Sequence, residues 1–233
     1  MPVPICDVPE ETFKRYRTNI EPLDRVLGGG LVVGSVLVFG GDPGVGKSSL
    51  AMQALAGLDR CCLYASGEES VAQAANRARR IDADSRNMMI VAETDLDIVF
   101  EHVRETKADV VLIDSMQTLT CSNTKGGAGS VTMVRECANR IVRFAKTHGI
   151  CVIVIGHVTH DGSLAGPMTL THLVDVVLDV SLGEGDERIV SCPSKNRFGP
   201  IRRRGRFMMT KNGLEPILAD DNESDGGPIN GFH

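Results

Sequence analysis

The stretch GDPGVGKSS, residues 41–49, decides the fold. It follows an apolar segment, SVLVFG at 35–40, and fits the pattern G-x-x-x-x-G-K-[ST] from Gly41 to Ser48. In a strand–loop–helix context this pattern is typical of a phosphate-binding loop, because the glycines let backbone amides turn towards a phosphate and the helix N-terminus adds favourable partial charge. We expect the whole loop to bind a nucleoside triphosphate, through Gly41, Asp42, Pro43, Gly44, Val45, Gly46, Lys47, Ser48 and Ser49.

Two side chains of the loop and one aspartate beyond it suit a triphosphate with its metal. Lys47 is expected to reach the β- and γ-phosphates, which gives it a catalytic role, and Ser48 offers a hydroxyl to Mg²⁺. Asp114 ends the apolar segment VVLID, residues 110–114, and the carboxyl ends of parallel strands are where ligands collect. We therefore expect Asp114 to hold the magnesium shell, and the sequence predicts ATP and Mg²⁺ as ligands.

Short apolar segments alternate with helix-length segments along the chain. The segments typical of strands are 35–40, 61–66, 88–92, 110–114 and 151–157. An amphipathic pattern over 129–148 is typical of a helix that packs on a sheet. After residue 175 the chain changes to short β-rich pieces separated by glycines, typical of antiparallel strands added at one edge. We predict an α/β fold with a mainly parallel central sheet flanked by helices and an antiparallel β extension at the C-terminal side.

Composition and cysteine spacing exclude several classes of protein. The 233 residues, 42% hydrophobic and 24% charged, suit one large domain with a sizeable core. No apolar run approaches the roughly 20 residues that span a bilayer, and the N-terminal segment lacks the apolar centre of a secretory signal, so we expect a cytoplasmic protein without a membrane partner. The seven cysteines are odd in number and none forms a C-x-x-C pair, so we expect neither a disulfide framework nor bound zinc.

A carboxylate that activates water is expected next to the phosphates. Glu68 and Glu69 follow the segment 61–66 in SGEES, where Gly67 lets the chain turn at the carboxyl edge of the sheet. Acidic residues are also favoured at helix N-termini, so the residues alone leave a structural role open for the pair.

The order of these motifs resembles that of one family, the bacterial RadA (Sms) DNA-repair ATPases, which are RecA-like motors. The likeness runs from about Thr18 to Ile217 and includes LDRVLGGGLVVGS, GGDPGVGKSSL, LYASGEES, VVLIDSMQTL and KNRFG. The resemblance implies a RecA-like P-loop ATPase core in a homo-oligomeric, usually hexameric, ring. It also implies a DNA-dependent ATPase that binds single-stranded DNA in the ring channel. Such a motor uses ATP in recombination and repair, by branch migration or helicase-type activity, beside a recombinase partner.

The resemblance also assigns roles to single residues. The first glutamate of GEES is catalytic in the family, which favours Glu68 over Glu69. KNRFG is the family signature, and its two cations, Lys195 and Arg197, are placed like the trans-acting catalytic groups of related ring helicases. On a strand, side chains two residues apart project from the same face, so we expect both cations to enter the neighbouring subunit's site.

RecA-like motors keep a polar sensor beside the γ-phosphate, and His157 and Gln117 are the candidates here. A hydrogen-bonded structural role is an equally simple alternative for each. His157 and His160 are three residues apart, as metal ligands can be, but no third ligand of matching spacing is evident.

By the same resemblance the chain divides into three parts. These are an N-terminal arm, residues 1–17, a RecA-like ATPase domain, residues 18–217, and an acidic tail, residues 218–233, which we expect to be disordered. Family members usually begin with a four-cysteine zinc finger and end in a Lon-protease-like domain, whereas only Cys6 precedes Thr18 here. Functions that depend on those two parts are therefore not carried over to this chain by resemblance.

Two glycine-rich loops are candidates for DNA contact. The loop 120–130, TCSNTKGGAGS, carries Lys125 and can offer backbone amides and one cation to phosphates. The loop 159–167, THDGSLAGP, is similar but nearly uncharged. Flexible surface loops are the alternative interpretation of both.

A basic cluster lies near the end of the chain. The stretch KNRFGPIRRRGRF, residues 195–207, carries six Lys and Arg residues in a chain whose formal net charge is -5. We expect its arginines to line the DNA path or a subunit interface, with a solvated basic turn as the alternative; they are Arg202, Arg203, Arg204 and Arg206. Aromatic residues make up 4% of the chain, which favours contact with the DNA backbone over base stacking.

Two other functions fit the same phosphate loop. One is a RecA-like regulatory ATPase that acts on protein partners without DNA, and salt-dependent binding of single-stranded DNA would separate it from a DNA motor. The other is a P-loop kinase for a small molecule. Two features of the sequence speak against a kinase. A glutamate is placed to activate water, and no pocket or lid for an acceptor molecule is evident.

Overall fold

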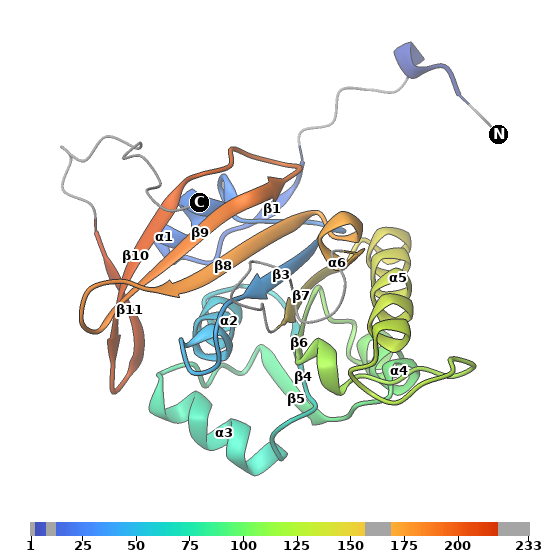
Figure 1. Ribbon diagram of the computed structural model, residues 1–233, viewed down its shortest axis with the longest axis horizontal. Helices are drawn as coiled ribbons and strands as arrows, with labels where there is room; N and C mark the ends of the chain where they lie inside the picture. The colour runs from blue at the N-terminus through green and yellow to red at the C-terminus, as the bar shows by residue number, and fades with distance from the viewer. Residues whose placement is uncertain (1–2, 8–12, 157–168, 219–233) are drawn as a thin grey trace.

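The computed structural model describes residues 3–7, 13–156 and 169–218 (Figure 1). Its strands are β1 (Arg15–Tyr16), β2 (Leu31–Val32), β3 (Val36–Gly40), β4 (Cys62–Ser66), β5 (Met88–Ala92), β6 (Val110–Asp114), β7 (Cys151–Ile155), β8 (Val176–Leu182), β9 (Glu187–Asn196), β10 (Arg204–Thr210) and β11 (Gly213–Ile217). Its helices are α1 (Glu21–Leu27), α2 (Lys47–Ala56), α3 (Val71–Arg80), α4 (Leu96–Thr106), α5 (Val131–His148) and α6 (Thr169–Leu173), with the short 3-10 helices η1 (Ile5–Asp7) and η2 (Met116–Thr118).

The central sheet runs in the order β11-β10-β9-β8-β3-β7-β6-β4-β5. The strands from β8 to β5 in this order are parallel to one another. From β3 the chain crosses to β4 on one side of the sheet and returns later to β8 on the other side. The loop after β3 therefore opens where the strand order reverses, which is where ligands bind in open α/β sheets.

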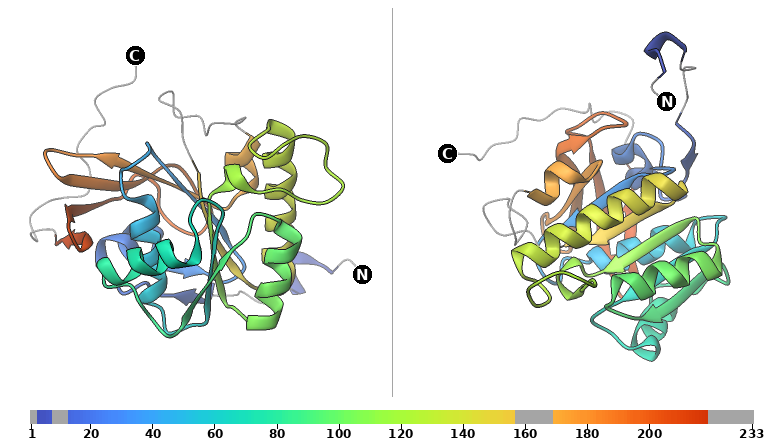
Figure 2. Two further views of the ribbon diagram at one scale, coloured as in Figure 1. Left: turned by 90° about the horizontal axis from the view of Figure 1, so that it is seen from below. Right: turned by 90° about the vertical axis from the view of Figure 1, so that its right-hand side faces the viewer.

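Helices cover both faces of this sheet (Figure 2). Alternate residues of β3 face opposite sides: Leu37 and Phe39 pack in one apolar core with α1, α2 and α3, and Val36 and Val38 pack in the other with α4 and α5. Because side chains alternate along a strand, a parallel strand covered on both faces is apolar throughout. None of the helices in the described ranges is long and apolar enough to cross a membrane.

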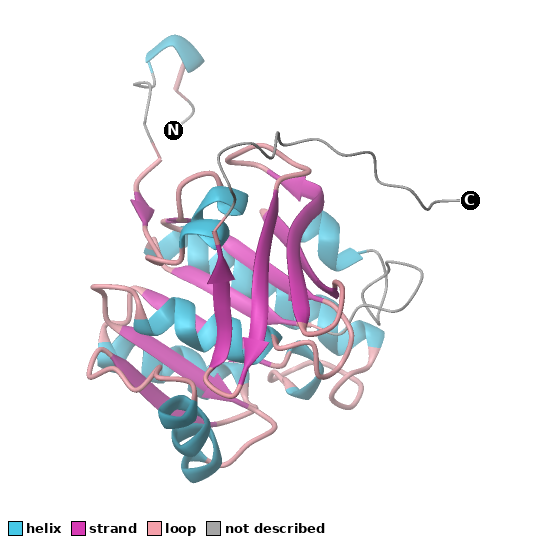
Figure 3. Ribbon diagram, turned by 90° about the vertical axis from the view of Figure 1, so that its left-hand side faces the viewer, coloured by secondary structure: helices cyan, strands magenta, loops and turns pink. Residues whose placement is uncertain are grey.

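The strands β9, β10 and β11 extend the sheet as antiparallel neighbours, seen from their side in Figure 3. This confirms the predicted mainly parallel sheet with antiparallel strands at the C-terminal side. The structure differs in one detail, because β8, the first of the β-rich pieces after residue 175, is parallel to β3 and antiparallel to β9. The connection from β7 is long enough for the crossover that a parallel strand requires.

Element boundaries differ slightly from those predicted. The strand predicted over 151–157 ends at Ile155, and the helix predicted over 129–148 begins at Val131 because Ser130 caps its first turn. The predicted division into arm, domain and tail stays a prediction. Part of the arm is strand β1, which pairs with β2, and most of the tail lies outside the described residues.

Candidate nucleotide-binding site

The phosphate loop joins the end of β3 to the start of α2. Gly46 adopts φ 102° immediately before this helix and, as glycine, has no side chain to cap the helix end. The N–H groups of the first turn are therefore available to an anion. Gly41 adopts φ 129°, and a Cβ there would lie 2.2 Å from the carbonyl oxygen of Val180 in β8. Both the backbone conformation and the close approach at Gly41 require glycine.

Lys47 is buried against the loop that precedes it. Its Nζ donates to the carbonyl oxygens of Gly41 and Asp42, each at 2.7 Å. Burial lowers the pKa of Lys47, and nearby carboxylates oppose that shift; they belong to Asp114, Asp42, Asp179 and Glu68. The structure thus brings Lys47 among the acidic residues that the sequence assigned to the metal and to water.

Asp114 ends β6 beside the end of β4. It is buried, it pairs with Ser66 across the sheet, and the Tyr64 hydroxyl donates to its Oδ2 at 3.1 Å. Ser48 is the second residue of α2 and is half-buried. This donor set fits Mg²⁺, which takes oxygen ligands and is usually bound by one or two carboxylates together with substrate phosphates.

The two glutamates after β4 contact different partners. Ser115, next to Asp114, donates its hydroxyl to Glu68 Oε1 at 2.7 Å. Glu69 Oε2 lies 2.7 Å from Arg77 Nη2 in α3, an ion pair whose angles are not those of a hydrogen bond. Glu68 therefore lies beside the proposed metal ligand, whereas Glu69 is turned towards α3. The catalytic role of Glu68 stays a prediction, and this arrangement favours it.

Sequence reasoning missed the residues that support Asp114. Arg77 Nη2 donates to the Tyr64 hydroxyl at 2.6 Å and lies 3.5 Å from Asp114 Oδ2. Burial and the charge of Asp114 raise the pKa of Tyr64, so its hydroxyl stays protonated and can donate. A tyrosine within an apolar strand was the available signal, but nothing in the local sequence pairs it with Arg77.

Asp179 is a second acidic residue that the sequence analysis did not single out. It lies in β8 opposite Gly40, the last residue of β3. Burial raises the pKa of Asp179, the charge of Asp42 raises it further, and the charge of Lys47 lowers it. The signal in the sequence was an acidic residue that interrupts the apolar run VVLDV. That this residue lies beside the phosphate loop follows only from the pairing of β8 with β3.

The first candidate sensor lies in η2, directly after β6. The Oε1 of Gln117 is buried, and within the described part of the chain no hydrogen-bond partner faces it. A Cβ on Gly67 would lie 2.0 Å from Thr118 Oγ1, so glycine is needed here for the close approach of η2. The other candidate sensor, His157, and the loop 159–167 lie outside the described residues.

Arg197 lies level with the start of β3, away from the phosphate loop, whereas Lys195 pairs with Val177, which is opposite Val38 in the middle of β3. The N–H of Arg197 donates to the carbonyl oxygen of Asp175 at 3.1 Å. The N–H of Asp175 in turn donates to the carbonyl oxygen of Val36 at 2.9 Å. Val36 begins β3, and the phosphate loop follows Gly40 at its end. The level of Arg197 at Val36 is thus four residues from Gly40, which corresponds to roughly 13 Å along the strand.

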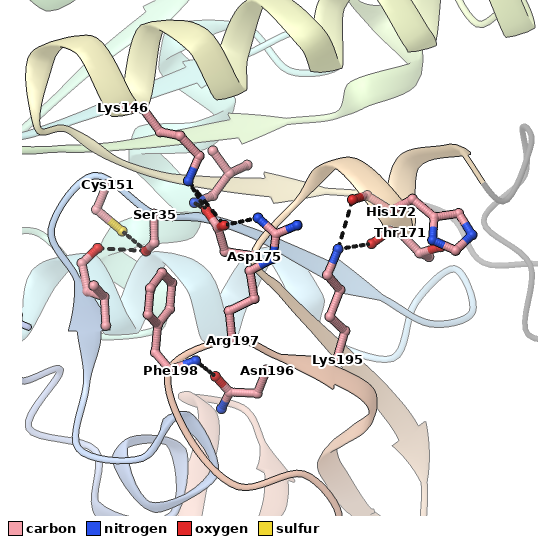
Figure 4. A network of polar contacts seen from close by, with 12 residues as sticks. Ser35, Lys146, Cys151, Thr171, His172, Asp175, Lys195, Asn196, Arg197 and Phe198 are labelled. Carbon is pink, nitrogen blue, oxygen red and sulfur yellow. Dashed lines mark hydrogen bonds and ion pairs between the residues drawn. The ribbon is translucent and has the colours of Figure 1, made fainter. Parts of the chain in front are cut away.

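Both cations contact groups of their own subunit (Figure 4). Arg197 Nη1 lies 2.9 Å from Asp175 Oδ1. Lys195 Nζ donates to the carbonyl oxygens of Thr171 and His172, each at 2.8 Å. Action of the two cations on a neighbouring subunit stays a prediction.

The other basic residues predicted to face DNA lie at the surface. Lys125 is exposed and lines an open polar cleft of about 560 Å³ beside α5. Arg202 and Arg204 are exposed, and Arg203 Nη1 donates to the carbonyl oxygen of Arg25 in α1 at 3.3 Å. The turn before β10 and the loop before α5 lie far apart in Figure 1, so the structure does not gather these cations into one patch.

The sequence around this site matches a known protein family. Residues 2–163 match the model of the family described as AAA domain. The matched span is more than half of the chain and contains the phosphate loop, Glu68 and Asp114. The chain belongs to the AAA domain family.

The chain is also similar to the DNA repair protein RadA of several bacteria. It is 44% identical to RadA of Listeria monocytogenes over 217 residues, which are 92% of this chain and 48% of that protein. It is 41% identical to RadA of Escherichia coli K12 over 218 residues, 91% of this chain and 47% of that protein. The resemblance to RadA is confirmed, and the chain spans about half the length of these relatives.

A solved structure of a KaiC-like protein from Pyrococcus horikoshii OT3 has the same fold. The TM-score is 0.71, the identity is 17%, and the match covers 89% of this chain and 100% of that chain. At this identity the likeness shows the fold alone, and it confirms the predicted RecA-like architecture of this AAA domain.

Proposed function

We propose that this chain is the ATPase core of a DNA-repair motor that binds ATP with Mg²⁺, hydrolyses ATP, and acts on single-stranded DNA as a homo-oligomeric, hexameric ring. The observation that carries the proposal is the meeting of Lys47, Asp114 and Glu68 at the carboxyl edge of a parallel sheet. The similarity to DNA repair protein RadA supports the part of the proposal that concerns DNA. Branch migration or helicase-type movement, beside a recombinase, is the corresponding role in the cell.

Each residue of the site has a separate role in this proposal. The loop amides and Lys47 bind the β- and γ-phosphates, and Ser48 and Asp114 hold Mg²⁺, which neutralises phosphate charge when it is bound. Glu68 orients a water molecule and accepts its proton as the water attacks the γ-phosphate. Gln117, with its buried Oε1, is placed after Asp114 to respond to the γ-phosphate.

Lys195 and Arg197 act on the nucleotide of a neighbouring subunit in this proposal. The separation of Arg197 from its own phosphate loop, roughly 13 Å along β3, supports its action in trans, because an arginine side chain does not span it. In a head-to-tail ring different surfaces of adjacent subunits meet, so a residue on one edge can face a site on the other edge. DNA contacts basic side chains through its phosphate backbone; these are the exposed Lys125, Arg202 and Arg204 and the half-buried Arg203.

The proposal is tested by measuring phosphate release from ATP with and without single-stranded DNA, at low and at high salt. We expect DNA to stimulate release and salt to weaken DNA binding steeply, because phosphate contacts release counterions. Lys47→Ala is expected to abolish nucleotide binding and release, and Lys211→Ala, which removes an exposed cation, is the matched control.

Two results would contradict the proposal. ATP hydrolysis without any DNA binding would favour a regulatory ATPase that acts on protein partners. Transfer of phosphate to a small-molecule acceptor, without release of inorganic phosphate, would favour a kinase.

A further inference from the structure

Asp175 is a buried carboxylate with partners on three elements (Figure 4). Its Oδ2 accepts the N–H of Val36 at the start of β3, at 3.0 Å. Its Oδ1 lies 3.1 Å from Lys146 Nζ in α5 and 2.9 Å from Arg197 Nη1 after β9. A buried carboxylate is tolerated only when it is paired and hydrogen-bonded, and Asp175 meets both conditions.

The two cations of the KNRFG stretch are held differently. Lys195 gives two of the three donors of an ammonium group to backbone carbonyl oxygens of α6. Arg197 faces Asp175 with Nη1, and its side chain remains 49% exposed. A guanidinium has five N–H donors in a fixed plane, so a contact on one side orients the others.

We propose that Asp175 is a positioning residue that holds the guanidinium of Arg197 at the amino edge of the sheet, oriented for a phosphate of the neighbouring subunit. The inference rests on the proposed trans-acting role of Arg197. Asp175 suits this task because its own position is set by β3, through the N–H of Val36, and a side chain anchored on a rigid strand has little freedom. Pre-orienting a long, flexible arginine avoids the entropy cost of ordering it during the reaction.

A purely structural role for Asp175 makes a different prediction. In that case the carboxylate only joins β3, α5 and the turn after β9, and its loss lowers stability without a specific effect on Arg197. The two roles are separated by combining substitutions at Asp175 and Arg197, because residues that act as one unit give non-additive effects.

The experiment compares Asp175→Asn, Arg197→Ala and the double variant in DNA-stimulated phosphate release. Asparagine keeps the size and an acceptor for Val36 but loses the charge that faces Arg197. We expect Asp175→Asn to slow release about tenfold to a hundredfold, the range expected from a small misplacement of a reacting group. We expect the double variant to be no slower than Arg197→Ala, and the nucleotide affinity of each subunit to be unchanged.

Glu187→Gln is the matched control. Glu187 is also a buried carboxylate, and it pairs with Arg206 in the antiparallel strands away from Asp175. Its substitution is expected to lower stability without slowing release. If Asp175→Asn does not fold, the double variant Lys146→Gln/Asp175→Asn replaces it in the experiment. This variant also removes the Lys146 cation, which would otherwise have lost its neutralising carboxylate.

Different results overturn different parts of the argument. Full activity of Arg197→Ala would overturn the trans-acting role and the positioning role together. If Arg197→Ala is slow, a wild-type rate for Asp175→Asn would overturn positioning alone. A double variant slower than Arg197→Ala by the full effect of Asp175→Asn would also overturn positioning alone.

Discussion

Glu68 and Glu69 are adjacent in the chain, but their carboxylates face different elements. The Ser115 hydroxyl binds Glu68 next to the proposed metal ligand, and Arg77 of α3 pairs with Glu69. A general base must lie within hydrogen-bond reach of the water that it activates. The side chain that pairs with a carboxylate therefore influences whether the carboxylate can accept a proton from that water. Arg77 thus gives the Glu69 carboxylate a cation as its partner, whereas the partner that Ser115 gives to Glu68 is a neutral hydroxyl.

We predict that Glu68→Gln leaves ATP bound and slows phosphate release by about a hundredfold or more, because an amide cannot accept a proton from water. Nucleotide affinity and single-turnover phosphate release measure the two effects separately. Glu69→Gln is the matched control and is expected to retain most of the activity. The opposite result, with Glu69→Gln slow and Glu68→Gln active, would assign the base to Glu69.

At the scale of elements, the start of α3 is set by a capping box. The Ser70 hydroxyl accepts the N–H of Gln73 at 3.3 Å, and the Gln73 side chain accepts the N–H of Ser70 at 3.0 Å. The cap satisfies backbone donors that the helix leaves unpaired. Because α3 also carries Arg77, the cap helps to place the residue that supports Asp114.

We predict that Ser70→Ala lowers the free energy of unfolding by about 1 kcal/mol, the usual effect of losing an N-cap side chain. Ser70→Asp keeps an acceptor at the cap and is expected to stay close to the wild type. Urea unfolding at neutral pH measures the difference. Equal stability of Ser70→Ala and the wild type would show that the cap is dispensable.

The loop that carries Lys125 is attached to α4 and α5 through Asp97. Asp97 Oδ2 accepts the Ser122 hydroxyl at 2.6 Å, and its Oδ1 pairs with Arg140. The hydrogen bond from Arg140, followed by that from Ser122, lowers the pKa of Asp97 to about 2, from an ordinary value of 3.8. The folded state therefore favours the ionised form, and this contribution to stability is present above about pH 4 and is lost as pH falls towards 2.

We predict that Asp97→Asn lowers the free energy of unfolding at pH 7 and weakens its dependence on pH between about 4 and 2. The difference from the wild type is expected to shrink as the pH approaches 2, because the wild-type carboxylate is then protonated too. Urea unfolding at several pH values measures this. A difference between the two proteins that does not change with pH would contradict an electrostatic cause.

At the scale of the whole molecule, the phosphate loop lies at the carboxyl end of β3 and Arg197 lies level with the amino end of that strand. In the proposed ring, each subunit would bind one nucleotide at its phosphate loop and offer Arg197 to the nucleotide of a neighbour. Hydrolysis that needs both groups then depends on assembly.

We predict that a mixture of Lys47→Ala and Arg197→Ala subunits recovers phosphate release that neither variant has alone. In mixed rings an intact loop of one subunit can meet an intact arginine of the other. A mixture of Lys47→Ala and Glu68→Gln subunits is the control and is expected to show no recovery, because each variant lacks a group of its own site. No recovery in mixed rings of the first pair would contradict action in trans.

The sequence by itself determined the parts of this protein that depend on short-range patterns. The phosphate loop is recognisable because glycine, lysine and serine must occur at set spacings for a backbone to surround a phosphate. The parallel sheet is recognisable because strands covered on both faces are apolar along their whole length. Asp114 could be placed at the edge of the sheet by the same reasoning, since it directly ends such a strand.

Only the tertiary structure decided which side chains meet. The contacts of Arg77 with Tyr64 and Asp114, and of Asp175 with Lys146 and Arg197, join residues from different elements. Such contacts depend on strand order and helix packing, which leave no short-range pattern in the chain. The edge on which Arg197 lies likewise follows from β8 being parallel to β3 and β9 antiparallel to β8, a pairing set by the packed sheet.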